Sequence, residues 1–307
     1  AYVVGGSVTT TGTFLLTATR TATIRANVIA AAGSVAIAGA GSGAASIGAS
    51  VATNRLGTAT NRLTTSAYSS GATIVAAGSV TMSVVAGGTI DAVVFAGAVA
   101  VAGSAGGSGA GSGSGTSATN TIFGGAEASI DGGTVSGSAV LLSASDTAVI
   151  KTLAGAASVA AAVSGGTAVA VAIGAAISTN TIDQLVEASA TATTVTTTAG
   201  ALTFTAVSSG SITAEVGAAS LAFAGGLGGF GVSGAGAGAT NTIQTRTVAY
   251  ATASKLTVAG AATLEATSTG ATIIARVLAA SAALGIGTTG VGASIGVAVA
   301  HNELALL

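Results

Sequence analysis

The sequence predicts an all-β protein, a parallel β-solenoid of about five repeats of about 61 residues each. Three observations predict this class. The composition is apolar and rich in β-branched residues, without proline. An asparagine recurs at an almost constant interval along the whole chain. Short runs of Val, Ile and Thr are separated by Gly or Ser, which is typical of strands.

The composition limits the classes of protein to which the chain can belong. Its 307 residues include 48 Gly, no Cys, eight Lys and Arg, and nine Asp and Glu, with a net charge of about −1. Disordered chains are polar and charged, so this apolar chain is expected to fold or assemble. The scattered basic residues provide no electrostatic footprint for nucleic acid or an anionic membrane. The lack of cysteine excludes a disulfide framework and a thiolate metal site.

The asparagines mark the repeat. They lie 66, 60, 61 and 61 residues apart, and a small duplication, TNRLGTATNRL at 53–63, accounts for the long first interval. The anchors are Asn54, Asn120, Asn180, Asn241 and Asn302. An Ala-Tyr pair stands at one distance before three of the anchors, at Tyr2, Tyr68 and Tyr250. The whole chain is therefore interpreted as one array, with units at 1–54, 55–120, 121–180, 181–241 and 242–302, and the next unit beginning at 303–307.

The first half of each unit is predicted to contain three strands. The first carries an apolar residue, at Val8, Ile74, Val135, Val195 and Leu256. The second carries an apolar cluster, at 14–16, 80–82, 140–142, 202–204 and Leu264. The third is marked by isoleucine, at Ile24, Ile90, Ile150, Ile212 and Ile273 or Ile274. Gly and Ser between these runs predict turns, in which small length differences between copies are expected to lie.

The second half of each unit contains about 25 residues without a charge, as in AGAASVAAAVSGGTAVAVAIGAAISTN. The length would suit a membrane helix with a small-residue packing face. The equivalent segment AGAVAVAGSAGGSGAGSGSGTSATN is too rich in Gly and Ser for a spanning helix, so insertion into a bilayer is not expected. Extended backbone with small side chains buried on both faces is the preferred interpretation.

The charges of the third strand indicate how the units stack. One charged residue in each copy alternates in sign, at Arg25, Asp91, Lys151, Glu215 and Arg276, although the last two lie further past the isoleucine. Opposite charges would attract and like charges repel in rungs about 4.8 Å apart, so this charge column has meaning only if corresponding residues are neighbours.

The asparagines favour the same arrangement. Asparagine suits a sharp turn, and stacked asparagine side chains can form a hydrogen-bonded ladder between copies. Three coils of about 20 residues per unit would place successive asparagines roughly 14 Å apart, too far for a ladder. One large, multilayered coil per unit, stacked in register, is therefore preferred, and three small coils remain the alternative.

Such a stack predicts self-association, because each unit buries its core only against its neighbours. The final HNELALL continues the pattern, and no capping segment is apparent. The opening AYVVGG lies within a repeat and has no signal-peptide pattern, so we expect a fragment or processed piece of a longer array. Exposed sheet ends and sparse charge predict lateral or longitudinal association into a filament.

No pattern of catalytic, cofactor-binding or metal-ligating residues is present, so an enzyme is not predicted. The single histidine, His301, occupies the position of a threonine in other copies and is interpreted as a turn variant. Gly226, Gly228 and Gly231 match a dinucleotide-binding spacing, but no strand and helix alternation surrounds them. No cluster of His and carboxylates has metal-ligand spacing.

Dense threonines offer a different kind of site. Thr17, Thr19, Thr21 and Thr23 lie on one face of a predicted strand, and TATTVTTT at 191–198 is similar. Flat threonine arrays could order water and bind ice, but this needs threonines in register across coils, and the other copies have Val, Gly, Ser or Glu. The β-propensity of threonine is the preferred explanation.

The strands of Val, Thr and Ile, followed by Ala/Gly runs that close on ATNTI-like steps in units near 60 residues, resemble the repeat regions of giant bacterial surface and secreted proteins. These are the filamentous-haemagglutinin-like and leukotoxin-type adhesins. The resemblance covers the whole chain and implies an extracellular or cell-surface filament, stalk or sheath without an active site, which associates with itself and attaches to a host or abiotic surface. The low charge and the lack of Asp-rich turns depart from that pattern and put calcium dependence in doubt.

Overall fold

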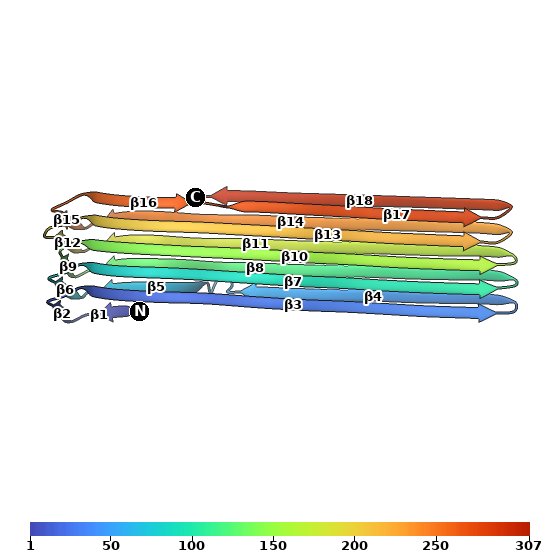
Figure 1. Cartoon of the computed structure of the whole chain (residues 1–307), viewed down its shortest axis with the longest axis horizontal. Coiled ribbons are helices and arrows are strands. Elements are labelled where there is room, and N and C mark those ends of the chain that lie inside the picture. The colour runs from blue at the N-terminus through green and yellow to red at the C-terminus, as the bar shows by residue number, and fades with distance from the viewer.

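The computed structural model describes residues 1–307 and consists of strands wound into large coils (Figure 1). Each coil contains a short strand, a long outgoing strand, a tight hairpin and a long return strand. In the third coil these are β9 (Thr134–Gly137), β10 (Val140–Ser164) and β11 (Thr167–Thr191). Since β-branched and small residues alternate along β10 and β11 without a proline, the backbone stays extended for 25 residues in each.

The other four coils follow the same path. The first is β2 (Ser7–Thr10), β3 (Phe14–Ala38), β4 (Gly41–Leu56) and β5 (Leu63–Ser70), and β1 (Tyr2–Val4) pairs with β5. The second is β6 (Thr73–Ala76), β7 (Val80–Ser104) and β8 (Gly107–Asp131). The fourth is β12 (Thr194–Thr197), β13 (Leu202–Gly225) and β14 (Gly228–Thr252). The fifth is β15 (Lys255–Thr257), β16 (Ala262–Ser268), β17 (Thr272–Ile286) and β18 (Thr289–Leu306).

Corresponding strands of successive coils pair in parallel and in register. The outgoing strands form one sheet, the return strands a second, and the short strands a third. Ile90 is paired with Ile24 and with Ile150, so one repeat advances the chain by one rung. The predicted all-β parallel solenoid with one large coil per repeat is confirmed, and the alternative of three small coils is wrong.

The two long sheets face each other along their whole length, and the sheet of short strands closes one end. We call the end with the short strands the three-sided half and the other the hairpin half, with the boundary at the anchor asparagines. In the third coil the three-sided half is 134–152 and 180–191, and the hairpin half is 153–179. The predicted multilayered coil is confirmed, because each coil contributes strands to two facing sheets and to a narrow third wall.

The second and third predicted strands are one continuous strand in each of the first four coils, which corrects the prediction of separate strands. Gly87 and Gly88, expected in a turn, lie inside β7 and keep their pairing with β10. A regular hydrogen-bonded neighbour on each side outweighs the weak strand preference of glycine. The predicted turns that do exist lie on either side of the short strands. Small length differences between copies occur after the short strands, and also at the hairpin between β13 and β14 and between β16 and β17.

The duplication at 53–63 adds a loop to the first coil. Leu56 pairs with Ile122 and Leu63 pairs with Gly124, so the six residues 57–62 stand opposite Phe123 alone. The loop leaves the sheet and returns to it without changing the register beyond it. The boundaries of the asparagine-anchored units fall near the middle of each return strand, whereas the coils themselves begin at the short strands.

The turn into each short strand needs a left-handed backbone. Gly132 and Gly133 supply it with φ of 68° and 75° before the third coil. The fourth and fifth coils use alanines instead, Ala192 with φ 51° and Ala253 with φ 50°. These are the only residues other than glycine with positive φ, so the hydrogen-bonded neighbours impose this turn even where the sequence disfavours it.

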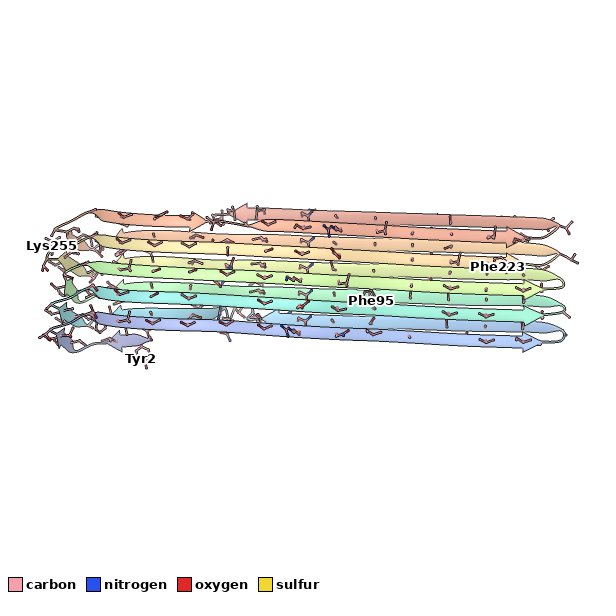
Figure 2. All side chains as sticks on the ribbon, in the orientation of Figure 1. Tyr2, Phe95, Phe223 and Lys255 are labelled. Carbon is pink, nitrogen blue, oxygen red and sulfur yellow. The ribbon has the colours of Figure 1, made fainter.

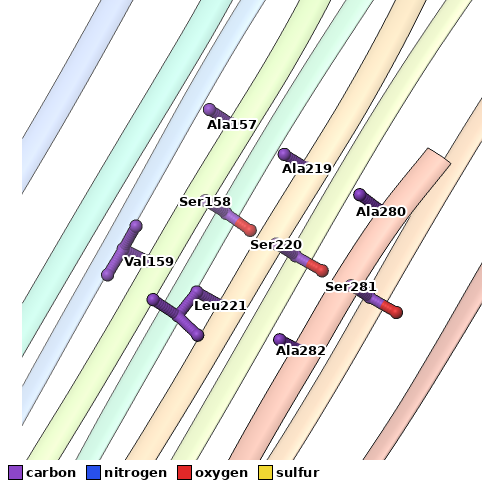
Figure 3. A pocket seen from close by; sticks show the side chains of 9 residues that line it. All are labelled: Ala157, Ser158, Val159, Ala219, Ser220, Leu221, Ala280, Ser281 and Ala282. Atoms are coloured by element: carbon purple, nitrogen blue, oxygen red, sulfur yellow. The ribbon is translucent and has the colours of Figure 1, made fainter. Parts of the chain in front are cut away.

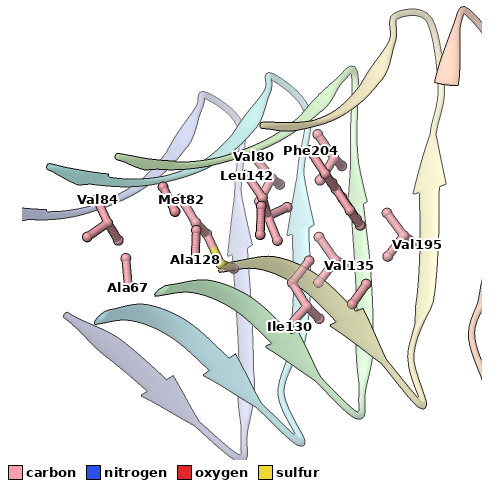
Figure 4. Packing of buried hydrophobic residues seen from close by; sticks show 14 of the residues in the cluster. Ala67, Val80, Met82, Val84, Ala128, Ile130, Val135, Leu142, Val195 and Phe204 are labelled. Carbon is pink, nitrogen blue, oxygen red and sulfur yellow. The ribbon is translucent and has the colours of Figure 1, made fainter. Parts of the chain in front are cut away.

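The three-sided half holds the large apolar core. Phe204, Met82 and Leu142 project from outgoing strands and meet Ile130 from β8 and Val195 from β12 (Figure 4). All five are fully buried. A second cluster, the isoleucine column with Ile150 at its centre, lies beside the boundary between the halves. Fully burying a side chain of this size contributes about 1.5–3 kcal/mol.

The interior of the hairpin half consists of small side chains beyond one column next to the boundary, which contains Val28, Val94, Ala154, Val216 and Val277. The inward positions of 30–38 and of 42–52 in the first coil, and their partners in the other coils, carry only Ala, Gly, Ser and one Thr. The sheets lie so close that a Cβ atom on Gly174 would be 2.7 Å from the carbonyl oxygen of Ala219. The expectation that both strand faces are buried is wrong within one chain, because the outward positions, apart from Gly155 and Gly228, are not buried.

The chain contains no helix long and apolar enough to cross a membrane.

Candidate functional site

The anchor asparagines form a continuous column on the inner face of the return sheet. The side-chain Nδ2 of each donates to Oδ1 of the next, at 2.8 Å from Asn54 to Asn120, 2.9 Å to Asn180, 2.8 Å to Asn241 and 2.9 Å to Asn302. The three central side chains are fully buried. Every amide points the same way along the stack, so the ladder satisfies buried polar atoms that would otherwise be costly.

One residue of the opposite sheet joins the ladder. The Thr152 hydroxyl, on β10, accepts a hydrogen bond from Asn120 Nδ2 at 2.8 Å and donates to Asn180 Oδ1 at 2.6 Å. The asparagines lie in the interior of the return strands, so their interpretation as turn residues is wrong. Alternation along ATNTI explains the placement, because Asn120 and Ile122 share the inward phase while the threonines point outward.

The threonines that flank the asparagines form two registered columns on the outer face of the return sheet. One contains Thr53, Thr119, Thr179 and Thr240, and the other contains Thr121, Thr181 and Thr242. His301 occupies the first column in the fifth coil, in the middle of β18 and exposed, which corrects its interpretation as a turn variant. The spacing of the hydroxyl groups is about 4.8 Å between coils and about 6.6 Å along a strand.

The threonines at 17–23 point outward from β3, as their alternation predicts. They are not continued as threonine columns, because the paired residues of β7 are Ser83, Val85, Gly87 and Thr89. The second dense segment, 191–198, contains a left-handed turn and the short strand β12, so it is not one flat face.

The predicted charge column is divided between two columns. Arg25, Asp91 and Lys151 are register partners on the outer face, but the next residue in that column is Thr213. Glu215 and Arg276 pair with each other one outward position further along, with 2.6 Å between Oε1 and Nη1. Both side chains of this pair are largely exposed, so it contributes roughly 0–1 kcal/mol.

A buried ion pair, which the sequence interpretation missed, lies inside the three-sided half. Arg20 of the first coil reaches past Ala86 of the second to Asp146 of the third, with 3.7 Å between Nη2 and Oδ1. Arg20 Nη1 also donates to the carbonyl oxygen of Leu63, where the strand resumes after the loop. Gly124 makes room, since a Cβ atom there would lie 2.8 Å from Asp146 Oδ2.

Burial dominates the electrostatics of this pair. It raises the pKa of the Asp146 carboxyl above its ordinary value, although the charge of Arg20 acts in the opposite direction. Burial also lowers the pKa of Arg20. The ion pair is therefore weaker than the desolvation of its members.

A second arginine clasp, an ion pair between the first and third coils, lies on the outer face. Arg62, at the end of the loop, lies over the ring of Phe123, 5.8 Å from its centroid. Its Nη2 donates to Asp183 Oδ2 at 2.7 Å, and its Nη1 donates to the Asp183 carbonyl oxygen at 3.1 Å. The loop is thus fixed from inside by Arg20 and from outside by Arg62.

The sequence contained a signal for the buried pair. Arg20 stands four residues before Ile24, and Asp146 stands four residues before Ile150. An even spacing from an inward isoleucine in a continuous strand places a side chain inside. The signal was lost because the two segments were interpreted as separate strands.

The Ala-Tyr pairs lie on the outer face near the end of the three-sided half. The rings of Tyr2 and Tyr68 are stacked, 5.5 Å between centroids. Tyr250 lies in the same register column but is separated from Tyr68 by Ser129 and Ser189. Its hydroxyl donates to Glu187 Oε1 at 2.7 Å, which raises the pKa of Tyr250.

The surface provides grooves and no enclosed reaction site. The Gly226, Gly228 and Gly231 spacing spans the hairpin between β13 and β14, so it does not begin a helix. No three His, Asp or Glu side chains lie close enough together to hold a metal ion. The main hollows lie on the outer sheet faces, and one runs over Ala157, Ala219 and Ala280 (Figure 3).

Comparison of the chain with protein-family models, curated proteins and solved structures found no match.

Proposed function

We propose that the chain is a structural section of an extended extracellular filament, stalk or sheath, without catalytic activity. The observation that carries this proposal is the one-dimensional register. Every long strand pairs with its counterparts in the adjacent coils, and the buried asparagine ladder follows the stack from Asn54 to Asn302. Repeat stacks of this kind provide a rigid cross-section that extends with the number of repeats.

The ladder also supports longitudinal self-association. Asn54 Oδ1 and Asn302 Nδ2 are the outermost acceptor and donor of the column. A further coil, in the same chain or in another copy, would continue both the ladder and the three sheets. The resemblance to filamentous adhesin repeats supports placement at the cell surface, with attachment to a host or abiotic surface as the role of the filament.

Antibodies against the folded protein, applied to intact cells of the source organism before electron microscopy, test the proposal. We expect label along projecting fibres or a surface sheath, with fibre diffraction of the isolated material showing one coil per about 4.8 Å along the axis. Label that appears only after permeabilisation, or a fibre without this repeat, would contradict it.

A second candidate function is binding of ice or another ordered surface, and the registered threonine columns favour it. The hydroxyl groups of Thr119, Thr179 and Thr181 lie on a flat sheet face, and the ladder behind them fixes the spacing between coils. This array differs from the one at 17–23 considered from the sequence.

Thermal hysteresis of the purified chain tests this candidate. Thr181→Lys would interrupt the array, and Thr147→Lys on the outer face of the other sheet is the matched control. The candidate requires hysteresis in the wild type and the control and its loss in Thr181→Lys. Absence of hysteresis in the wild type would remove ice binding and leave the structural proposal untouched.

A further inference from the structure

The hairpin half has an apolar outer face on each sheet. The outgoing apolar face consists of the outward positions of 29–37, 95–103, 155–163, 217–225 and 278–286. None of these positions carries a polar side chain. The return apolar face consists of the outward positions of 43–51, 109–117, 169–177, 230–238 and 291–299, where Ser117 is the only polar residue.

The side chains of this half are distributed in the reverse of the usual order. Beyond the valines next to the boundary, Ala, Gly, Ser and one Thr fill the interior, whereas the larger Val, Ile, Leu and Phe side chains point outward. Ile37 is 82% exposed and Ile173 is 57% exposed. Phe95 and Phe223 also project from the outgoing face (Figure 2). Since burial of large apolar side chains is a main source of stability, this distribution indicates that the outer faces are covered in the functional state.

The shape of the sheets supports the same conclusion. The strands of successive coils run almost parallel across the whole stack, with little of the usual twist (Figure 1). Flat sheets of many strands are unusual, and stacking against another sheet is what typically stabilises them. Two flat apolar faces on opposite sides of one molecule fit a layered arrangement.

The two faces are complementary in relief. On the outgoing face, small residues form a groove that runs along the stack, through Ala31, Gly97, Ala157, Ala219 and Ala280. Val159 and Leu221 border it on one side (Figure 3). On the return face, isoleucines form an interrupted ridge at Ile47, Ile173 and Ile295, with glycines between them.

The ridge lies directly behind the groove, with Ile173 of the third coil behind the groove residue of the fourth. Gly174, next to Ile173, abuts the carbonyl oxygen of Ala219 in the groove column. A second copy shifted along the normal to the sheets would therefore bring its isoleucine ridge onto this groove. We propose that a second copy of this chain packs its return apolar face on the outgoing apolar face. This deepens the proposed structural role and names its lateral partner.

The size of the faces suits a specific contact. Each spans about 26 Å along the strands and about 19 Å across five strands, so a pair of faces buries about 1,000 Å² in total. This is about the minimum area of a biological interface and is typical of weak contacts, which repetition along a stack would reinforce. Because the two surfaces differ, the contact does not close on itself, and further copies add to each side. The product is a layered sheath or bundle.

Sedimentation velocity of the full chain over a range of concentrations tests the proposal. Ala157→Lys places a charge in the groove, and Thr147→Lys places the same charge ten residues earlier on the outer face of the same strand. We expect the wild type and Thr147→Lys to form growing oligomers. We expect Ala157→Lys to need at least about tenfold higher concentration to associate, since an unpaired charge would be desolvated in the contact.

A mixing experiment identifies the two surfaces. Ile173→Glu disrupts the ridge and leaves the groove intact, so it should also fail to associate alone. Mixed with Ala157→Lys, it offers an intact groove to an intact ridge, and a one-to-one dimer that grows no further is expected. Circular dichroism and thermal unfolding check that each variant has the wild-type fold.

Three results would overturn the proposal. They are a wild type that stays monomeric at all concentrations, an Ile173→Glu variant that associates normally, and a mixture that forms no dimer. Binding of the monomer to phosphatidylcholine vesicles would instead assign the faces to lipid. Each result concerns the sides of the stack, so it is distinguishable from failure of the extracellular filament proposal.

Discussion

Two phenylalanines of the fourth coil, on the same strand, show how the halves of the molecule differ. Phe204 is fully buried between the sheets in the three-sided half. Phe223 points outward in the hairpin half, between Ala222 and Ala224, which are buried. The short strands hold the long sheets apart at one end and create room for large side chains. The hairpin lets them approach until, beyond the valines next to the boundary, only Ala, Gly, Ser and one Thr line the interior.

The difference shows that the large side chains of one strand can point inward at one end and outward at the other. In β13 the inward phase begins with Leu202 and Phe204, whereas from Ala218 onward it carries only Ala and Ser. The three-sided half is stabilised by its own core, whereas the hairpin half has tight backbone packing inside and apolar surface outside. This contrast leads to four measurements.

The largest effect is expected from Phe204→Ala. Removing a fully buried phenylalanine leaves a cavity in the main core, so the free energy of unfolding should fall by about 3–5 kcal/mol. Phe223→Ala is the matched change in the hairpin half and should cost less than about 1 kcal/mol in the monomer. Denaturant unfolding measures both. Equal losses would show that the halves do not differ as described.

The next effect is expected at the boundary, from Asn180→Ala. This change breaks the ladder on both sides and leaves Asn241 Oδ1 buried without its donor, so the free energy of unfolding should fall by about 1–3 kcal/mol. Asn27→Ala, on the exposed face of β3, should change stability by less than about 0.5 kcal/mol. An unchanged midpoint for Asn180→Ala would contradict a stabilising ladder.

Two serines in the hairpin interior should respond differently to replacement by alanine, with opposite changes in the free energy of unfolding. Ser158 is buried and its hydroxyl makes no hydrogen bond within the chain, so Ser158→Ala should be neutral or stabilising by up to about 1 kcal/mol. Ser233 bonds to the hydroxyl of Ser220 at 2.7 Å and donates to its carbonyl oxygen at 3.0 Å, so Ser233→Ala should cost about 1 kcal/mol. The same sign for both in thermal unfolding would argue against the difference in pairing.

The smallest effect on the free energy of unfolding is expected from a change of pH, through the ionisation of the Asp146 carboxyl. Burial raises the pKa of this carboxyl in the folded protein, so the folded state binds more protons than the unfolded state between the two values. The contribution of Asp146 to stability is therefore greatest below the unfolded pKa and falls as pH rises through the folded pKa. Asp146→Asn lacks this titration, so its stability should rise relative to that of the wild type as the pH increases from acid to neutral. A relative stability of Asp146→Asn that instead rises toward acid would reverse this assignment.

The sequence allowed prediction of the repeat and the stacking, because both depend on identities that recur. The isoleucine of the outgoing strand and the asparagine of the return strand return at one interval, and both lie in register. The place of Asn120 inside a strand was not predictable from propensity, since asparagine is uncommon in strands. Stacking with identical neighbours supplies hydrogen bonds that an isolated strand lacks.

Which face of each strand points inward in the hairpin half could not be predicted, for a different reason. Segments such as Gly107–Thr119 have small residues in both phases, so hydrophobicity does not indicate the inner face. Where the phases differ, as along Val169–Ile177, the larger residues lie outside, against the usual rule. Only the distance between the sheets determines which residues face inward, and this distance is set by the hairpin and by glycines such as Gly174.

The two arginine clasps of the first coil have a consequence for cooperativity. A stack coupled only between adjacent coils unfolds by fraying from either end. Arg20 and Arg62 instead connect the first coil to the third, across the second. This second-neighbour coupling should make the first three coils melt as a single block, while the fourth and fifth open separately. Hydrogen exchange would then show one shared opening rate for β3, β7 and β10, and a faster one for β17 and β18.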